Sequence, residues 1–455
     1  MDGFTIIHRA YLLSYIYKSV IEEAFNLLKG GNIVNPALSA EKKERLAQRN
    51  ILLFIIGKFI SLSGASIYSF VIGLYILKVT GLGTSFAIAL VCASLPRILF
   101  GPLAGTIADK VNRKMLIILS EVASGLLMVF ILFYGYFWGL PLFLLYLSEA
   151  LLAITSTFFS VTASSALASM AGDQNIQKAG SLNQSASSLA GIIGPLIAGI
   201  LYAFLSIELI VLLTAVTFFS AGIIEFFIRF NLYESKNSIR PSEPFFQSLA
   251  GGFRYLKGNG FLYSLLKIAF WINFFFAGIN VAIPYILNNT LNFSSQAYGT
   301  TAAMVSVGAL VSSLIISRQK EHNQKTRMIR NGFLLMSVLI SMIGIPPLLG
   351  FTSSALNISY YIILLGLTGA SIMIVNIPIM VLIQRTTPNE MRGRIFGLVE
   401  TIAAAISPLG MILFGLLLDY IPSFYVPFIT GGAFLLIGVF SLSKLPEPAE
   451  TKLAG

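Results

Sequence analysis

Residues 101–114, GPLAGTIADKVNRK, form a short polar junction between two long apolar runs of the chain. The junction holds small residues four positions apart, then an acid and a basic pair: Gly101, Gly105, Asp109, Arg113 and Lys114. Small residues at this spacing let two membrane helices approach closely. The carboxylate that follows can face the amino terminus of a neighbouring helix, whose dipole favours negative charge. The junction therefore predicts a tight, charged loop at the mouth of a helical membrane protein.

The composition around this junction is that of a membrane protein. The mean hydropathy is +0.84 and 11% of the residues are charged, whereas soluble domains carry about 25% charged residues. Apolar runs of about 20 residues, long enough to cross a bilayer as helices, recur along the chain. The net charge of +11 is spread over the short loops, which does not fit the single basic face of a nucleic-acid-binding protein. We expect an all-α membrane protein that has the lipid bilayer, and no nucleic acid, as a partner.

Twelve apolar runs predict twelve transmembrane helices. They lie at 50–77, 84–108, 115–136, 140–169, 180–204, 207–229, 261–287, 295–317, 328–350, 355–384, 394–418 and 423–443. The longest polar connection, 230–260, separates two six-helix halves, 50–229 and 261–443. Lys58 and Lys267 stand at corresponding places in the first and seventh helices, which supports a repeat. Transporters are often built from such repeats, with the substrate site at their interface.

Lysine and arginine are distributed unevenly over the loops. Alternate loops hold almost all of them, and the other set of loops holds only Lys78. Basic loop residues collect on the cytoplasmic side of a membrane. Both ends of the twelve-helix core, and the tail 444–455, are therefore expected in the cytoplasm, with the core crossing a bacterial inner membrane.

Residues 1–49 lie outside the twelve helices. Their apolar residues are interrupted by Arg9, Lys18, Glu22 and Glu23, which suits neither a spanning helix nor a cleavable signal peptide. An amphipathic helix in the membrane interface fits this pattern, and a loosely ordered cytoplasmic tail is the alternative. A charged run, SAEKKERLAQRN, links the segment to the first helix.

With twelve spans, the junction at 101–114 resembles the loop signature of the major facilitator superfamily. The resemblance implies a charge network that latches the two halves at the cytoplasmic side, with Asp109 as the latch acid. Arg113 would meet an acid near the end of the fourth helix, for which Asp173 is the candidate.

The fifth predicted helix carries a second signature, SLAGIIGPLIAGI, with Gly191, Gly194, Pro195 and Gly199. Proline bends a membrane helix, and glycines permit close packing around the bend. The stretch resembles the fifth-helix signature of exporters in the superfamily, which implies a role in antiport. Structural packing alone is the alternative.

Other stretches resemble one branch of the superfamily, the macrolide-efflux and enterobactin-exporter-like permeases. LPRILFGPLAG, QRTTPNEMRGRIFG and ISPLGMILFGLLLD carry this resemblance, which covers roughly residues 50–445. Two features depart from the drug–proton antiporters. The fourth helix, LYLSEALLAITSTFFSVTASS, has no arginine, and the loop ISRQKEHNQKTR is a degenerate copy of the first signature.

Six of the charged side chains within the predicted helices are candidates for a function in the membrane: Lys58, Arg97, Glu121, Glu149, Lys267 and Glu400. A charge in the bilayer is costly and marks a functional hypothesis. Burial favours the neutral form of a carboxyl group, which can carry a proton from one side to the other. We expect Glu149 to couple transport to protons, with Glu400 and Glu121 next. The alternative is structural pairing of Glu149 with Arg97, or of Glu121 with Lys58.

A solute cavity would use polar and aromatic side chains of several helices: Ser61, Ser63, Tyr68, Trp271, Asn273, Asn280 and Asn376. Ordinary helix packing is the alternative for each of them. An apolar, aromatic cavity suits amphipathic solutes.

The sequence thus predicts a secondary transporter that exports an amphipathic small molecule, such as a macrolide-like drug or a siderophore, in exchange for protons. A lysophospholipid flippase or an uptake symporter of the same fold is one alternative. A non-transporting sensor or toxin-immunity protein is the alternative of another class. The chain has no G-x-x-x-x-G-K-[ST] loop, a lone cysteine, Cys92, and two distant histidines, His8 and His322. We expect a monomeric carrier without enzymatic activity, cofactor or metal.

Overall fold

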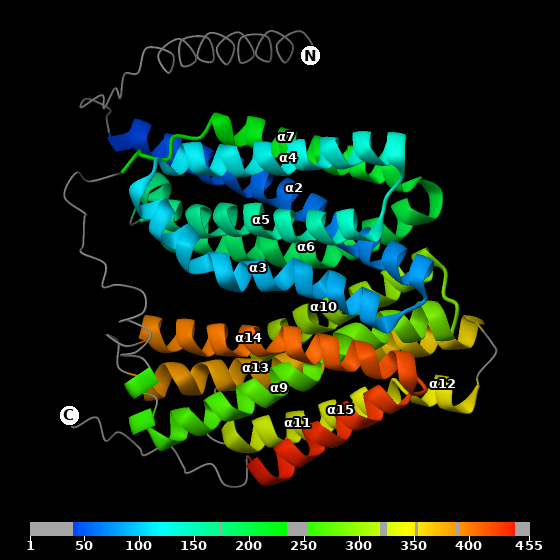
Figure 1. Ribbon diagram of the computed structural model, residues 1–455. Coiled ribbons are helices and arrows are strands. Elements are labelled where there is room, and N and C mark those ends of the chain that lie inside the picture. The colour runs from blue at the N-terminus through cyan, green and yellow to red at the C-terminus, as the bar shows by residue number, and fades with distance from the viewer. Residues whose placement is uncertain are drawn as a thin grey trace, which may run out of the picture.

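A computed structural model describes residues 40–172, 174–233, 253–255, 257–318, 325–350, 354–387 and 392–441. In this part of the chain every element of secondary structure is a helix. Figure 1 shows two stacked groups of long helices, one from each half of the sequence. Residues 1–39, which make up most of the segment predicted to be amphipathic, lie outside the described residues.

The amino-terminal group contains the first six spans. They are α2 (Ala40–Thr80), α3 (Gly83–Lys110), α4 (Arg113–Trp138), α5 (Leu142–Ala171), α6 (Ile176–Phe204) and α7 (Ile207–Phe226).

The carboxyl-terminal group contains the other six spans, two of which continue into π-helical turns. Its elements are α9 (Gly260–Tyr285) with η1 (Ile286–Thr290), α10 (Ser295–Arg318), α11 (Lys325–Met342), α12 (Ile345–Leu349), α13 (Ser354–Thr386), α14 (Arg392–Tyr420), and α15 (Tyr425–Leu436) with η2 (Ile437–Ser441).

The helices account for every predicted span. Ten helices of the described residues are long and apolar enough to cross a membrane, and two shorter apolar helices, Ala404–Tyr420 and Tyr425–Val439, complete the twelve. The predicted all-α membrane fold with two six-helix halves is therefore confirmed.

The first helix begins about ten residues before the predicted start, because polar contacts continue it beyond the apolar run. Glu44 accepts hydrogen bonds from the side-chain amide of Asn175 at 3.0 and 3.1 Å. Asn50 exchanges two hydrogen bonds with the backbone of Arg229, at 2.9 and 3.3 Å. From residue 40 onward, the charged run is thus the first part of α2, packed on neighbouring loops.

The ninth predicted helix is interrupted by prolines. α11 ends at Met342, and the short α12 carries Pro346 and Pro347 in its first turn. Proline has no backbone N–H, so it is best tolerated in the first turn of a helix and bends or breaks a helix interior. The pair therefore ends one helix and starts another.

The two ends of the bundle differ in chemistry. We call the end at which α3 starts the far end, and the end at which α3 finishes, beside the arginine- and lysine-rich loops, the basic end (Figure 1). Large exposed aromatic side chains gather at the far end: Tyr136, Phe137, Trp138, Phe143 and Tyr420. Aromatic residues favour the membrane–water interface, so the far end has the composition of a bilayer surface.

The halves share a hydrophobic core at the far end. The buried cluster of the carboxyl-terminal half includes Leu74, Leu77, Phe86 and Ala87 of α2 and α3, together with Leu418 of α14. Figure 1 shows α3 and α14 converging toward this end and diverging toward the basic end. The far end is therefore where the two halves are joined.

Glycines set the closest helix contact inside the carboxyl-terminal half. A Cβ atom on Gly308 of α10 would overlap the carbonyl oxygen of Gly366 of α13. A Cβ atom on Gly369 would overlap the carbonyl oxygen of Val305. Because these neighbours are backbone atoms, they cannot rotate away.

We predict that Gly308→Ala lowers the apparent melting temperature of the purified protein by several degrees, since overpacking costs about 1–3 kcal/mol. Gly432→Ala is the matched control, because a Cβ atom there meets nothing within 4 Å. Thermal unfolding in detergent measures both variants. Equal melting temperatures for the two would contradict the described α10–α13 packing.

Candidate functional site

Glu149 lies on α5, 3% exposed, where α5 meets α2 and α3. Its Oε2 accepts a hydrogen bond of 2.9 Å from the Ser69 hydroxyl of α2. Its Oε1 has no hydrogen-bond partner among the described residues. Arg97 of α3 attracts the carboxylate electrostatically, but the two side chains make no direct ion pair in the part of the chain that the structure describes. One carboxylate oxygen is thus left available for a proton or a polar ligand atom.

The neighbouring residues of Glu149 fix the position of α5 against α2. The Tyr68 and Ser148 hydroxyls are joined by a hydrogen bond of 2.5 Å, and Tyr68 is fully buried. Successive residues of the two helices, 68–69 and 148–149, therefore pair side by side. The predicted cavity residue Tyr68 is engaged in this contact.

A second buried acid, Glu121 of α4, lies elsewhere in the amino-terminal half. It is 1% exposed, and its Oε1 accepts a hydrogen bond of 2.7 Å from the Ser61 hydroxyl. Ser61, predicted to line a cavity, is therefore buried against Glu121. Glu225 of α7 is fully buried and repels Glu121 electrostatically. Sequence reasoning missed Glu225, although it stands inside the apolar run IIEFF and could have been found by the same rule that selected Glu121.

The two predicted intramembrane lysines have unlike surroundings. Lys58 is buried and donates a hydrogen bond of 2.5 Å to the Asn183 side chain of α6. Lys267 is exposed and lies 4.5 Å from the centre of the Tyr263 ring. Lys58 thus contacts Asn183, and the two lysines do not occupy equivalent sites. Glu400 lies on α14, but its side chain is outside the described residues.

At the basic end, the loop after α3 packs against its own half. The Arg113 guanidinium donates a hydrogen bond of 3.4 Å to the Ser169 hydroxyl near the end of α5. The Lys114 ammonium lies 4.9 Å from the centre of the Phe226 ring. Arg113 thus contacts the end of the fourth span through Ser169. Asp173 and the side chain of Asp109 lie outside the described residues, so the predicted latch stays a prediction.

The remaining cavity candidates divide into two groups. Ser63 is partly buried, and Asn273 donates a hydrogen bond of 2.9 Å to the carbonyl of Ala269 on its own helix. Trp271, Asn280 and Asn376 are exposed. Trp271 is 50% exposed and packs edge-on against Phe270 and Phe274 of α9, so it presents an aromatic surface.

Asp419, the acid of the stretch LLLD in α14, joins the two halves at the far end. Its carboxylate accepts hydrogen bonds from the backbone N–H groups of Gly83 and Thr84, at 2.5 and 3.1 Å, and from the Thr84 hydroxyl. These groups belong to the first turn of α3 in the other half. Asn289 adds a hydrogen bond of 3.0 Å to the carbonyl of Gly81. Sequence reasoning did not assign Asp419.

Glycines bring α6 and α10 together next to this contact. A Cβ atom on Gly199 would lie 2.8 Å from the Cα atom of Gly299, and one on Gly299 would lie 2.8 Å from the carbonyl oxygen of Pro195. Phe70 stacks on Tyr298 at 4.9 Å between ring centres. Gly199 and Pro195 of the fifth-helix signature therefore lie at the interface of the halves. Gly194 faces Ser66 of α2, and Gly191 has open space before it.

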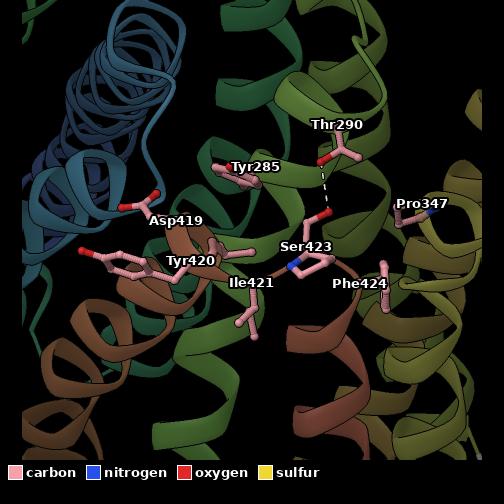
Figure 2. Close-up of a pocket in the computed structure, with 10 residues that line it drawn as sticks. Tyr285, Thr290, Pro347, Asp419, Tyr420, Ile421, Ser423 and Phe424 are labelled. Carbon is pink, nitrogen blue, oxygen red and sulfur yellow. Dashed lines mark hydrogen bonds between the residues drawn. The ribbon is translucent and has the colours of Figure 1, made fainter.

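A cavity of about 400 Å³ opens beside Asp419. Figure 2 shows Thr290 hydrogen-bonded to Ser423 in its lining, and Asp419 pointing away toward the blue helices of the amino-terminal half. The cavity lies at the far end and contains none of the predicted cavity residues. It is a recess beside the contact of the halves, distinct from the surroundings of Glu149.

Comparison with known proteins decides the family. The model of the Major Facilitator Superfamily matches residues 54–408, and a second match covers 268–455. The chain belongs to the major facilitator superfamily. The resemblance inferred from the loop signature and from the branch-specific stretches is confirmed, because relatives of this major facilitator protein include macrolide efflux proteins.

Two curated relatives cover most of the chain. The MFS-type transporter YfiS of Bacillus subtilis is 25% identical over 77% of this chain and 82% of its own length. Macrolide efflux protein A of Streptococcus pyogenes is 22% identical over 80% of this chain and 88% of its own length.

Solved structures share the fold of this major facilitator protein. The nucleoside transporter NupG aligns with a TM-score of 0.69 at 13% identity, covering 87% of this chain and 98% of its own. A bacterial homologue of the iron transporter ferroportin, in its inward-facing state, aligns with a TM-score of 0.66 at 16% identity, covering 88% and 98%. The chain is thus a multi-pass membrane transporter by family and fold.

We predict that Gly199→Ala opens the far end, because the added methyl group collides with the backbone of α10. In a Cys92→Ala background, a cysteine replacing the buried Tyr298 should react faster with a membrane-impermeant maleimide when Gly199→Ala is present. Gly191→Ala, on the same helix but facing open space, should leave the reaction rate unchanged. Equal rates in the two variants would contradict the α6–α10 contact.

Proposed function

We propose that this protein is a secondary active exporter that moves an amphipathic small molecule outward in exchange for protons, by alternating access. The observation that carries the proposal is the position of Glu149. It is a buried carboxyl group between three helices of one half, with one oxygen unpartnered among the described residues and a cation, Arg97, within electrostatic reach. A membrane protein rarely keeps such a group without a function.

The contact of the halves supports the alternating-access part of the proposal. The Asp419 hydrogen bonds and the Gly199–Gly299 approach both lie at the far end. With the basic end in the cytoplasm, as the loop charges predict, this conformation is sealed toward the outside. Exchange with the cytoplasm then occurs at the basic end.

The proton step follows from the surroundings of Glu149. When the far end is open, a proton from outside binds the carboxylate, and the attraction between Glu149 and Arg97 is lost. When the far end is closed, the proton leaves toward the cytoplasm, and the carboxylate again attracts Arg97. Solute binds in the cytoplasm-facing state and leaves in the other, so that each proton entering drives solute out.

The solute class is proposed from two independent features. Trp271 of α9 offers an exposed aromatic side chain that packs on the partly buried Phe274, and aromatic cavities suit amphipathic ligands. Macrolide efflux protein A is among the relatives, which favours a macrolide-like molecule, with a siderophore as the second choice. We propose that the protein acts as a monomeric carrier without catalysis.

The test is transport into inside-out proteoliposomes under an imposed proton gradient, with solutes chosen by a thermal-shift screen of macrolides, siderophores and lysolipids. We predict that Glu149→Gln reduces gradient-driven transport to the level of protein-free vesicles, while solute binding persists. Glu208→Gln, which removes an exposed acid at the start of α7, is the control and should transport normally.

Two results would contradict the proposal. Full gradient-driven transport by Glu149→Gln would reject proton coupling through this residue. Failure of every screened solute to move, together with co-purification of an intact partner protein, would favour a sensor or immunity protein over a transporter.

A further inference from the structure

We propose that Glu121 and Glu225 form a second proton-binding site, a carboxyl pair that holds one proton beneath a single turn of α2. The site is separate from Glu149 and uses an acid, Glu225, that the mechanism above does not need. Its role in coupling rests on the proposed transport function, but its occupancy by a proton does not.

The packing of three helices brings the two acids together. α4 lies against α7, where a Cβ atom on Gly222 would be 3.4 Å from the Cβ atom of Glu121. Glu225 stands one turn further along α7, toward the basic end. A Cβ atom on Gly57 of α2 would lie 3.2 Å from Cγ and 3.3 Å from Oε1 of Glu225. The absence of a side chain at Gly57 therefore makes room for the Glu225 carboxyl group.

The same turn of α2 covers the other acid. Ser61, four residues after Gly57, donates its hydrogen bond of 2.7 Å to Oε1 of Glu121. The side chains of Glu121 and Glu225 are 1% and 0% exposed. α2 thus closes over both carboxyl groups and separates them from solvent.

The oxygens of the pair are largely without partners. Oε2 of Glu121 and both carboxyl oxygens of Glu225 have no hydrogen bond among the described residues. Two neighbouring carboxylates in a low-dielectric interior repel each other, and unpartnered buried anions are strongly destabilised. One proton removes a charge from the pair and supplies a hydrogen-bond donor.

Three cations on the helices around the pair make contacts of their own. On α2, Lys58 donates to Asn183, and Arg49 donates to the carbonyl of Phe227 at 3.1 Å. On α4, the Lys114 ammonium lies over the Phe226 ring. Neither acid forms an ion pair within the described residues, so the charge of the pair is left for a proton to neutralise.

α2 also connects this site with Glu149. Ser69, which donates to Glu149, lies eight residues after Ser61, or about 12 Å along the helix. A movement of α2 that admits water to the pair therefore alters the hydrogen bond of Glu149 as well. In alternating access, such a movement would release the proton of the pair when α2 shifts against α4 and α7.

Infrared difference spectroscopy of the full-length protein in lipid tests the site, because a protonated carboxyl group has a resolved stretching band that shifts in D₂O. We predict that the band is present at neutral pH in the wild type and in Glu149→Gln, and that the Glu121→Gln/Glu225→Gln variant loses it. Glu225→Gln alone should change the amplitude or frequency of the band. The readout needs no solute, so it is independent of the transport assay.

An unchanged band in the double variant would overturn the proposal. If the double variant does not fold, an unchanged band in Glu225→Gln would overturn it. Removal of the band by sodium ions at constant pH would assign the site to a metal cation instead. As a second measurement, the melting temperature of the wild type should fall as pH rises, because the folded pair holds a proton that the unfolded carboxyl groups release. A melting temperature that rises over the same pH range would also contradict it.

Discussion

The first turn of α3 has no cap from its own half. Leu82 precedes the helix and offers no side-chain hydrogen bond, although the first N–H groups of any helix need partners. Asp419 supplies them from α14, 336 positions later in the sequence. A negative charge at a helix amino terminus is also favoured by the helix dipole. The far end of the molecule is therefore closed by hydrogen bonds between Asp419 of one half and the first turn of α3 in the other.

This contact suits a structure that must open and close. At a bilayer surface, water can replace the carboxylate at the α3 terminus, so opening leaves no buried donor unsatisfied. The glycine contact between α6 and α10 adds close backbone packing to the hydrophobic core that the halves share at this end. In the interior, by contrast, the buried acids Glu149, Glu121 and Glu225 all lie in the amino-terminal half and all touch α2 or its neighbours. The amino-terminal half thus holds these three buried acids, and the carboxyl-terminal half presents Trp271 of α9.

The spans could be predicted from sequence because the length of an apolar run is a local property. The start of α2 could not, since it depends on contacts of Glu44 and Asn50 with loops more than 120 residues away. The rotation of each helix about its axis also escaped prediction. Lys58 and Ser61 are three residues apart, yet they reach Asn183 of α6 and Glu121 of α4.

The acids also divide into those that local sequence reveals and those whose role depends on tertiary contacts. Glu149 and Glu121 stood out because a charge within an apolar run is conspicuous in any sequence. Glu225 stands one residue before the end of α7, but it lies inside the apolar run IIEFF, so the same rule would have selected it. Asp419 likewise ends a helix, and its importance arises only from the partner helix that folding brings to it.

The most direct test is the distance between the halves at both ends, measured by double electron–electron resonance. In a Cys92→Ala background, spin labels at the exposed positions Tyr136 and Leu349 report on the far end, and labels at Val111 and Arg318 report on the basic end. Asp419→Asn weakens charge-assisted hydrogen bonds worth on the order of 1–3 kcal/mol. We predict longer far-end distances and shorter basic-end distances in this variant than in the wild type. Unchanged distances, or a shift of both ends in the same direction, would contradict it.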